Sequence, residues 1–203
     1  MKPALIILAA GGTGRELAEL MADTYDVRGF LDDVQKGPRI LGKIADLGQY
    51  LPEAKLASGL GSYRSMTRRR ALLEGIPLDA FVTYVASDAR VYPSASLGHA
   101  VTVCPGSIVT SNATLGTHSF VYHNCVIAHD ARIGDYTMVS NSVTISGNVT
   151  IGQNCYIGAG STLLEGVTIG DDCVIAAGAT VITDVPPGTI YIAPGKSKAN
   201  GYR

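Results

Sequence analysis

Branched aliphatic residues recur at every sixth position along the second half of the chain. From Ala89 to Asp184 the sequence divides into sixteen six-residue units without an insertion. The first residue of each unit is always Ala, Val, Ser, Cys or Thr. The third is always a branched aliphatic residue: Val91, Leu97, Val103, Val109, Leu115, Val121, Ile127, Ile133, Val139, Ile145, Ile151, Ile157, Leu163, Ile169, Ile175 and Val181. An α-helix of period 3.6 cannot keep such a repeat on one face.

The six-residue repeat predicts a parallel β-helix. Each unit supplies a short strand and a corner, and three units complete one triangular coil of eighteen residues. The aliphatic side chains then stack inside the prism, and every strand pairs with the coils on either side of it.

The first 88 residues have a different pattern, in which short apolar runs alternate with amphipathic segments. Strands alternating with helices predict a parallel α/β sheet. We expect strands at Ala4–Ala9, Val27–Leu31, Lys55–Ser58 and Ala80–Val85, and helices at Arg15–Ala22 and from about Ser62 to Glu74. The sequence therefore predicts two domains, residues 1–88 and residues 89–203.

A glycine loop, Gly11-Gly12-Thr13-Gly14, follows the first expected strand. Such a loop lets the backbone approach a phosphate at a helix N-terminus. An acid about twenty residues further on, at Asp32 or Asp33, suits a ribose hydroxyl. Ala9 replaces the first glycine of the motif, and a plain strand-to-helix turn would give a similar pattern. A domain of 88 residues has room for half a dinucleotide fold, which would hold a mononucleotide or a nucleotide-linked group.

Composition narrows the class of protein. The chain is 46% hydrophobic and 16% charged, against about 25% charged in an average domain, so it folds around a core of small aliphatic side chains. A net charge of −1 means that the chain has no excess of positive charge with which to bind nucleic acid or an anionic membrane. The longest apolar run, Ala4–Ala10, is too short to span a bilayer and leads into no cleavage site. We expect a soluble cytoplasmic protein.

The four cysteines fit the repeat as small core residues. Cys125, Cys155 and Cys173 occupy the first position of their units and Cys104 a fourth position. The chain has no CxxC pair, so neither a zinc knuckle nor a disulfide framework is indicated.

Four histidines interrupt the repeat: His99, His118, His123 and His129. His129 is the one followed by a carboxylate, Asp130, at an expected corner. A neighbouring carboxylate can accept a hydrogen bond from Nδ1–H of an imidazole. Such a hydrogen bond makes the imidazole a better general base. Exposed His–Asp pairs also occur as solvated surface features.

Together these features resemble the sugar O-/N-acyltransferases of the left-handed β-helix hexapeptide-repeat superfamily, which include sialic-acid O-acetyltransferases and nucleotide-amino-sugar N-acetyltransferases. The segments that carry the resemblance are Ala10–Glu16, Phe30–Asp33 and Val126–Asp135. The resemblance implies an α/β half-Rossmann domain followed by a left-handed parallel β-helix. It also implies an acetyl-CoA-dependent homotrimer, without a metal, that acetylates the amine or hydroxyl of a sugar, most often a nucleotide-linked amino sugar.

The resemblance assigns roles to individual positions. It implies His129 as the catalytic base and Asp130 as the acid that raises its basicity. It implies substrate contacts at Gly11, Gly12, Thr13, Asp32, Asp33 and Gly59, and contacts with acetyl-CoA at Met138, Ala159 and Ala177. The chain departs from the family pattern at three places: Thr13 and Met138 each replace a histidine, and Tyr122-His123-Asn124 replaces Asn-His-Gly.

Two other classes of function stay open. The segment His118–Cys125 resembles the paired-histidine segment of γ-class carbonic anhydrases, which bind zinc through three imidazoles, although Val82 stands where their first histidine would fall. A non-catalytic nucleotide-binding scaffold would keep the same fold. The cations Arg64, Lys196, Lys198 and Arg203 are candidates either for phosphate contacts or for a solvated surface.

Overall fold

The computed structural model describes residues 1–51, 53–193 and 195–199. Its contacts divide the chain into two compact units. The first unit comprises Met1–Ser65 and Ala71–Val82, and the second comprises Met66–Arg70 and Thr83–Arg203. Arg203 itself lies outside the described residues.

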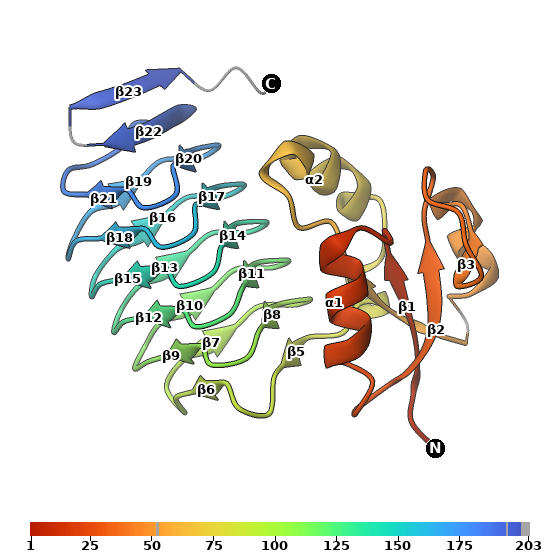
Figure 1. The fold of residues 1–203 in the computed structure, drawn as a ribbon. Helices are drawn as coiled ribbons and strands as arrows, with labels where there is room; N and C mark the ends of the chain where they lie inside the picture. The colour runs from red at the N-terminus through yellow and green to blue at the C-terminus, as the bar shows by residue number, and fades with distance from the viewer. Residues whose placement is uncertain (52, 194, 200–203) are drawn as a thin grey trace. The chain divides into compact units, whose positions relative to one another are not determined.

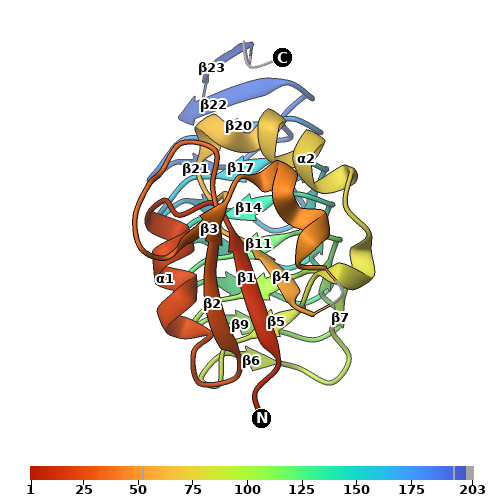
Figure 2. The same cartoon turned by 90° about the vertical axis from the view of Figure 1, so that its right-hand side faces the viewer.

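The first unit is built on a four-stranded parallel sheet in the order β3-β2-β1-β4. Its central strand β1 is fully buried at Leu5, Ile7 and Leu8, as a strand covered on both faces should be. Figure 2 shows β1 between β2 and β4. The elements of this unit are β1 (Ala4–Leu8), α1 (Gly12–Leu20), β2 (Asp26–Leu31), β3 (Ile40–Gly42), η1 (Ile44–Gln49), β4 (Lys55–Ser58), η2 (Tyr63–Ser65) and η3 (Leu78–Ala80). The helix α2 (Met66–Glu74) belongs partly to each unit.

The structure differs from the sequence-based elements in two places. The third strand of the sheet is β3, which the pattern did not predict because its three residues are only half buried. The strand expected at Ala80–Val85 is divided between the units. Phe81 makes only an isolated parallel bridge with Leu56 of β4, and β5 (Tyr84–Val85) pairs with β8 (Thr102–Val103) of the second unit. Tyr84 faces Thr102, eighteen residues later, so the coil period already applies at this point.

The second unit is a parallel β-helix of two-residue strands, which ends in the longer strand β22 and in β23, paired antiparallel with β22 (Figure 1). Its three sheets run in the orders β19-β16-β13-β10-β7, β21-β18-β15-β12-β9-β6 and β23-β22-β20-β17-β14-β11-β8-β5. The remaining strands are β6 (Arg90–Val91), β7 (Ser96–Leu97), β9 (Ile108–Val109), β10 (Thr114–Leu115), β11 (Phe120–Val121), β12 (Val126–Ile127), β13 (Arg132–Ile133), β14 (Met138–Val139), β15 (Thr144–Ile145), β16 (Thr150–Ile151), β17 (Tyr156–Ile157), β18 (Thr162–Leu163), β19 (Thr168–Ile169), β20 (Val174–Ile175), β21 (Thr180–Val181), β22 (Thr189–Ala193) and β23 (Lys196–Ala199).

The inward positions of the repeat form one continuous core. Ile127 pairs with Ile145, and Ile145 with Leu163, each eighteen residues apart and each fully buried. All third-position residues are buried except Val91 and Leu97, which are partly exposed in the first coil. The predicted phase of the repeat is confirmed. Within the described residues all four cysteines are buried and none forms a disulfide, as expected of core residues.

The last residue of each unit makes the corner with a left-handed backbone. From Ala100 to Gly178 these residues have φ between 52° and 77°, which glycine and asparagine adopt at least cost. His118 and Tyr136 are bulky exceptions, one coil apart, and their rings stack with centroids 5.3 Å apart. The buried Arg69 of α2, in the same unit, donates hydrogen bonds to the carbonyl oxygens of both residues.

No helix in the described part of the chain is long and apolar enough to cross a membrane.

The buried His118 makes stability depend on pH. Burial, together with the charge of Arg69, lowers the pKa of His118 from 6.5 to about 4. Between these two values the unfolded chain binds a proton that the folded chain does not, so stability falls as the pH falls. We replace His118 with Asn, a residue that tolerates the positive φ of this position. Between about pH 7 and about pH 4.5 we expect the melting temperature of His118→Asn to fall less than that of the wild type. Equal losses in circular dichroism melts would contradict this role.

Candidate active site

His129 lies at an exposed corner of the β-helix, directly after β12. Its imidazole Nδ1 is 2.9 Å from Oδ2 of Asp130, and the two side chains are 56% and 43% exposed. Asp130 has φ 59°, so the corner requires a residue that tolerates the left-handed region, and aspartate is one of the few that do. The repeat therefore explains the backbone conformation of Asp130. It does not explain the carboxylate, which orients the imidazole of His129.

The charge state of Asp130 determines how the imidazole is oriented. Hydrogen bonds from His129 and from Asn112 lower the pKa of the Asp130 carboxyl. An ionised carboxylate can only accept, so His129 Nδ1–H donates and Nε2 is left as the basic nitrogen. This is the arrangement that a general base requires.

Two further residues touch this pair, and sequence reasoning missed both. Asn112, one coil before Asp130, donates from Nδ2 to Asp130 Oδ1 at 3.1 Å. Gly147, one coil after His129, lies against the imidazole, and a Cβ built on it would overlap Cε1 and Nε2 and lie 3.0 Å from Nδ1. The eighteen-residue coil period, applied to His129 and Asp130, would have found both.

The predicted acetyl-CoA contacts fall into two groups. Ala159 and Ala177 are exposed at the same corner of successive coils, where Gly178 N–H donates to the Ala159 carbonyl at 2.8 Å. Met138 lies in β14, and its side chain has no exposed surface in the single chain. β14 pairs with β17, the strand that precedes Ala159. The contacts of all three residues with acetyl-CoA stay predictions.

The glycine loop of the first unit combines crowded and open positions. Ala9, at the place of the missing first glycine, has φ 74°, a conformation that glycine adopts at lower cost. A Cβ on Gly14 or on Gly59 would overlap the Ala9 carbonyl, so close packing requires both glycines. A Cβ on Gly11 or on Gly12 would meet no atom within 4 Å. Packing therefore explains Gly14 and Gly59 but leaves Gly11 and Gly12 open to a ligand.

The acids after β2 hold the loops in place. Asp32 accepts hydrogen bonds from the backbone N–H of Ala10 through Oδ2, and from those of Val34 and Gln35 through Oδ1. Asp33 Oδ1 accepts one from the Ile44 N–H at 3.1 Å. Their expected ribose contacts stay predictions, because the hydrogen bonds that the structure shows serve the protein backbone. Thr13, the other loop residue expected at the sugar, is half buried in the first turn of α1.

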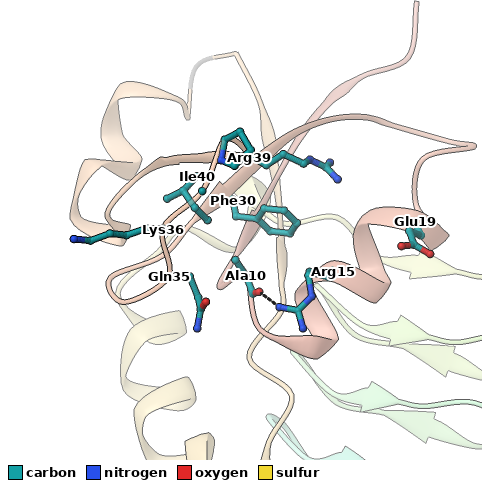
Figure 3. A pocket seen from close by; sticks show the side chains of 10 residues that line it. Ala10, Arg15, Glu19, Phe30, Gln35, Lys36, Arg39 and Ile40 are labelled. Atoms are coloured by element: carbon teal, nitrogen blue, oxygen red, sulfur yellow. Dashed lines mark hydrogen bonds between the residues drawn. The ribbon is translucent and has the colours of Figure 1, made fainter.

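A cavity of about 310 Å³ lies beside the glycine loop within the first unit. Figure 3 shows Phe30 amid the labelled side chains, with Arg15 hydrogen-bonded to the Ala10 carbonyl at 2.8 Å. The Arg39 guanidinium lies 5.2 Å from the centre of the Phe30 ring. The lining residues are Ala10, Arg15, Glu19, Phe30, Gln35, Lys36, Gly37, Pro38, Arg39 and Ile40. Apolar surface beside three cationic groups suits a base or ribose joined to a phosphate. Of the cations that the sequence offered for phosphate contacts, the described Arg64, Lys196 and Lys198 do not line this cavity.

The zinc alternative lacks a ligand set in the structure. The described residues contain no group of three or more His, Cys, Asp or Glu side chains that could hold a metal ion. His118, the first histidine of the segment concerned, is buried against Tyr136. Of the candidate phosphate-binding cations, Arg64 donates to the Tyr63 hydroxyl at 3.2 Å, and Lys196 and Lys198 are exposed on β23.

Comparison with known proteins agrees with this architecture. Residues 112–147 and 148–183 match the family model described as bacterial transferase hexapeptide (six repeats). The match lies in the part of the chain that carries the six-residue repeat. No curated protein matches it in sequence.

Several solved structures share the fold of this hexapeptide-repeat protein over 98% of its length. A mutant perosamine N-acetyltransferase from Caulobacter crescentus, in complex with CoA and GDP-perosamine, is 22% identical with a TM-score of 0.84 and is covered over 97% of its chain. The acetyltransferase domain of PglB from Neisseria gonorrhoeae, in complex with acetyl coenzyme A, is 28% identical with a TM-score of 0.72 and is covered completely, at 100%. WeeI from Acinetobacter baumannii is 19% identical with a TM-score of 0.80, again with 100% coverage. The predicted α/β unit followed by a left-handed parallel β-helix, and the resemblance to sugar acyltransferases, are confirmed.

Proposed function

We propose that this hexapeptide-repeat transferase moves the acetyl group of acetyl-CoA to the amine of a nucleotide-linked amino sugar, with His129 as general base. The observation that carries the proposal is the exposed His129–Asp130 hydrogen bond, which leaves Nε2 as the basic nitrogen. Two of the similar structures hold CoA or acetyl-CoA, and one of these also holds GDP-perosamine. An acceptor hydroxyl remains the alternative to the amine.

The chemistry needs one proton acceptor and no covalent enzyme intermediate. As the sugar nitrogen attacks the thioester carbonyl, His129 Nε2 takes the proton that the nitrogen loses. The carbon–sulfur bond then breaks, and the CoA thiolate leaves and receives the proton as a thiol. The ionised Asp130 stabilises the imidazolium formed on the way. A base of this kind contributes roughly 10²–10⁴ in rate.

We assign the nucleotide part of the acceptor to the first unit. The cavity beside the glycine loop joins the apolar face of Phe30 to the cations Arg15, Lys36 and Arg39. The open positions Gly11 and Gly12 begin α1, where backbone N–H groups favour phosphate. Because acetyl-CoA and nucleotide-linked sugars are cytoplasmic metabolites, we place the reaction in the cytoplasm.

We also propose that the protein is a homotrimer. On the outer face of the β12 sheet, Ile108 and Val126 are paired neighbours and are 36% and 37% exposed. A closed cyclic assembly covers such a face without open-ended stacking. Light scattering should give about three times the 21.1 kDa of the chain, and Val126→Lys should lower that mass. A monomer at micromolar concentration would refute the assembly.

A panel of nucleotide-linked amino sugars tests the function directly. Each is mixed with protein and acetyl-CoA, and release of the CoA thiol is followed with a thiol reagent. Thiol release that depends on one amino sugar supports the proposal. If no amino sugar supports release while a nucleotide still binds, the scaffold alternative holds.

Removal of the base should slow the chemistry without weakening binding. We expect His129→Ala to lower kcat roughly 10²–10⁴-fold with little change in either KM. Asp130→Asn should lower it less, because the imidazole stays in place but loses the carboxylate that orients it. Turnover near that of the wild type in His129→Ala at neutral pH would end the general-base assignment.

The open glycine loop gives a test that separates binding from folding. Gly12→Ala should leave the melting temperature nearly unchanged, since its Cβ meets no protein atom. It should raise the KM of the nucleotide sugar on the order of tenfold and leave that of acetyl-CoA unchanged. Gly48→Ala in η1, where a Cβ is equally unhindered, is the matched control and should change neither. Unchanged KM values in Gly12→Ala would mean that no ligand approaches the loop closely.

A further inference from the structure

Gly147 lies against the imidazole of His129, one coil further along the β-helix. A Cβ on Gly147 would overlap the ring at Cε1 and Nε2. Gly147 is itself buried, whereas the His129 side chain is 56% exposed. The imidazole therefore occupies the volume that a side chain at position 147 would fill.

The backbone does not require glycine at this position. The φ of Gly147 lies outside the left-handed region. The equivalent corner positions of the other coils, spaced by eighteen residues, carry Pro93, Ser111, His129, Glu165 and Thr183. Glycine occurs in this column only at the coil that follows the histidine.

The backbone at Gly147 also cannot move away from the ring. Gly166 N–H donates to the Gly147 carbonyl at 3.0 Å, and Asn148 N–H donates to the His129 carbonyl at 3.0 Å. The chain here is thus bonded to the coils on both sides. A methyl group at position 147 would displace the imidazole rather than the backbone, and the 2.9 Å hydrogen bond to Asp130 would be lost with it.

We propose that Gly147 is a positioning residue, whose missing side chain lets the His129 imidazole lie against the next coil with Nδ1 on Asp130 and Nε2 free to take the acceptor's proton. The proposal rests on the proposed role of His129 for its catalytic meaning. Its structural content, the placement of the ring, holds independently of any activity.

The first measurement observes the ring directly. With ¹³C-labelled histidine, the four histidines give four Cε1–H signals, and the His129 signal is identified by its loss in His129→Ala. In Gly147→Ala the His129 signal should shift while the other three stay in place. Thr183→Ala, at the same corner two coils further on, is the matched control and should leave all four unchanged. A His129 signal that does not move in Gly147→Ala would overturn the proposal even in a protein without activity.

The second measurement is kinetic. Gly147→Ala should lower kcat by about 10–100-fold, as expected of a base displaced by about 1 Å, with both KM values changed less than about twofold. Loss of kcat with an unmoved His129 signal, or a rise confined to the KM of acetyl-CoA, would assign Gly147 a direct substrate contact instead and overturn the positioning role. Absence of acetyl transfer in the wild type would refute the proposed function and leave the NMR result standing.

If Gly147→Ala fails to fold, the double variant Gly147→Ala/His129→Ala decides the matter. Removal of the imidazole vacates the space that the new methyl group needs, so the double variant should fold with a melting temperature close to that of His129→Ala. A double variant that also fails to fold would show that the coil itself requires glycine.

Discussion

The stacking of inward aliphatic side chains at intervals of eighteen residues is the constraint on which the second unit depends. Ile127, Ile145 and Leu163 are in register on one edge and are fully buried. A slip of one residue along any strand would turn an aliphatic side chain outward and a polar one inward. The register is therefore fixed from coil to coil, and this also fixes the position of every corner residue.

The candidate active site is a consequence of this register. Asn112, the His129–Asp130 pair and Gly147 lie on three successive coils, and each contact between them joins positions that are eighteen residues apart or adjacent. The scaffold supplies rigidity because each corner is bonded to the coils on both sides. The His129 imidazole is thus held on regular structure rather than on a long loop, which favours a fixed orientation.

The first unit meets a different physical demand, the assembly of loops at the carboxyl ends of parallel strands. Three backbone N–H groups converge on the Asp32 carboxylate and tie the glycine loop after β1 to the loop after β2. Gly14 and Gly59 let two other segments approach Ala9 closely. These contacts leave a cavity with an apolar face and cationic side chains beside the loops.

The sequence alone determined the β-helix, its phase, the buried cysteines and the prominence of His129 and Asp130, because a repeat of six leaves the same signature in every coil. It also indicated the glycine loop. Tertiary structure decided what the repeat pattern does not encode: that β5 joins the β-helix, that Met138 is buried, and that Asp32 bonds to backbone. Asn112 and Gly147 were within reach of the eighteen-residue period, but only the folded coils show an amide on the carboxylate and an imidazole in the place of a Cβ. Such contacts join residues that are distant in sequence, and local propensity carries no information about them.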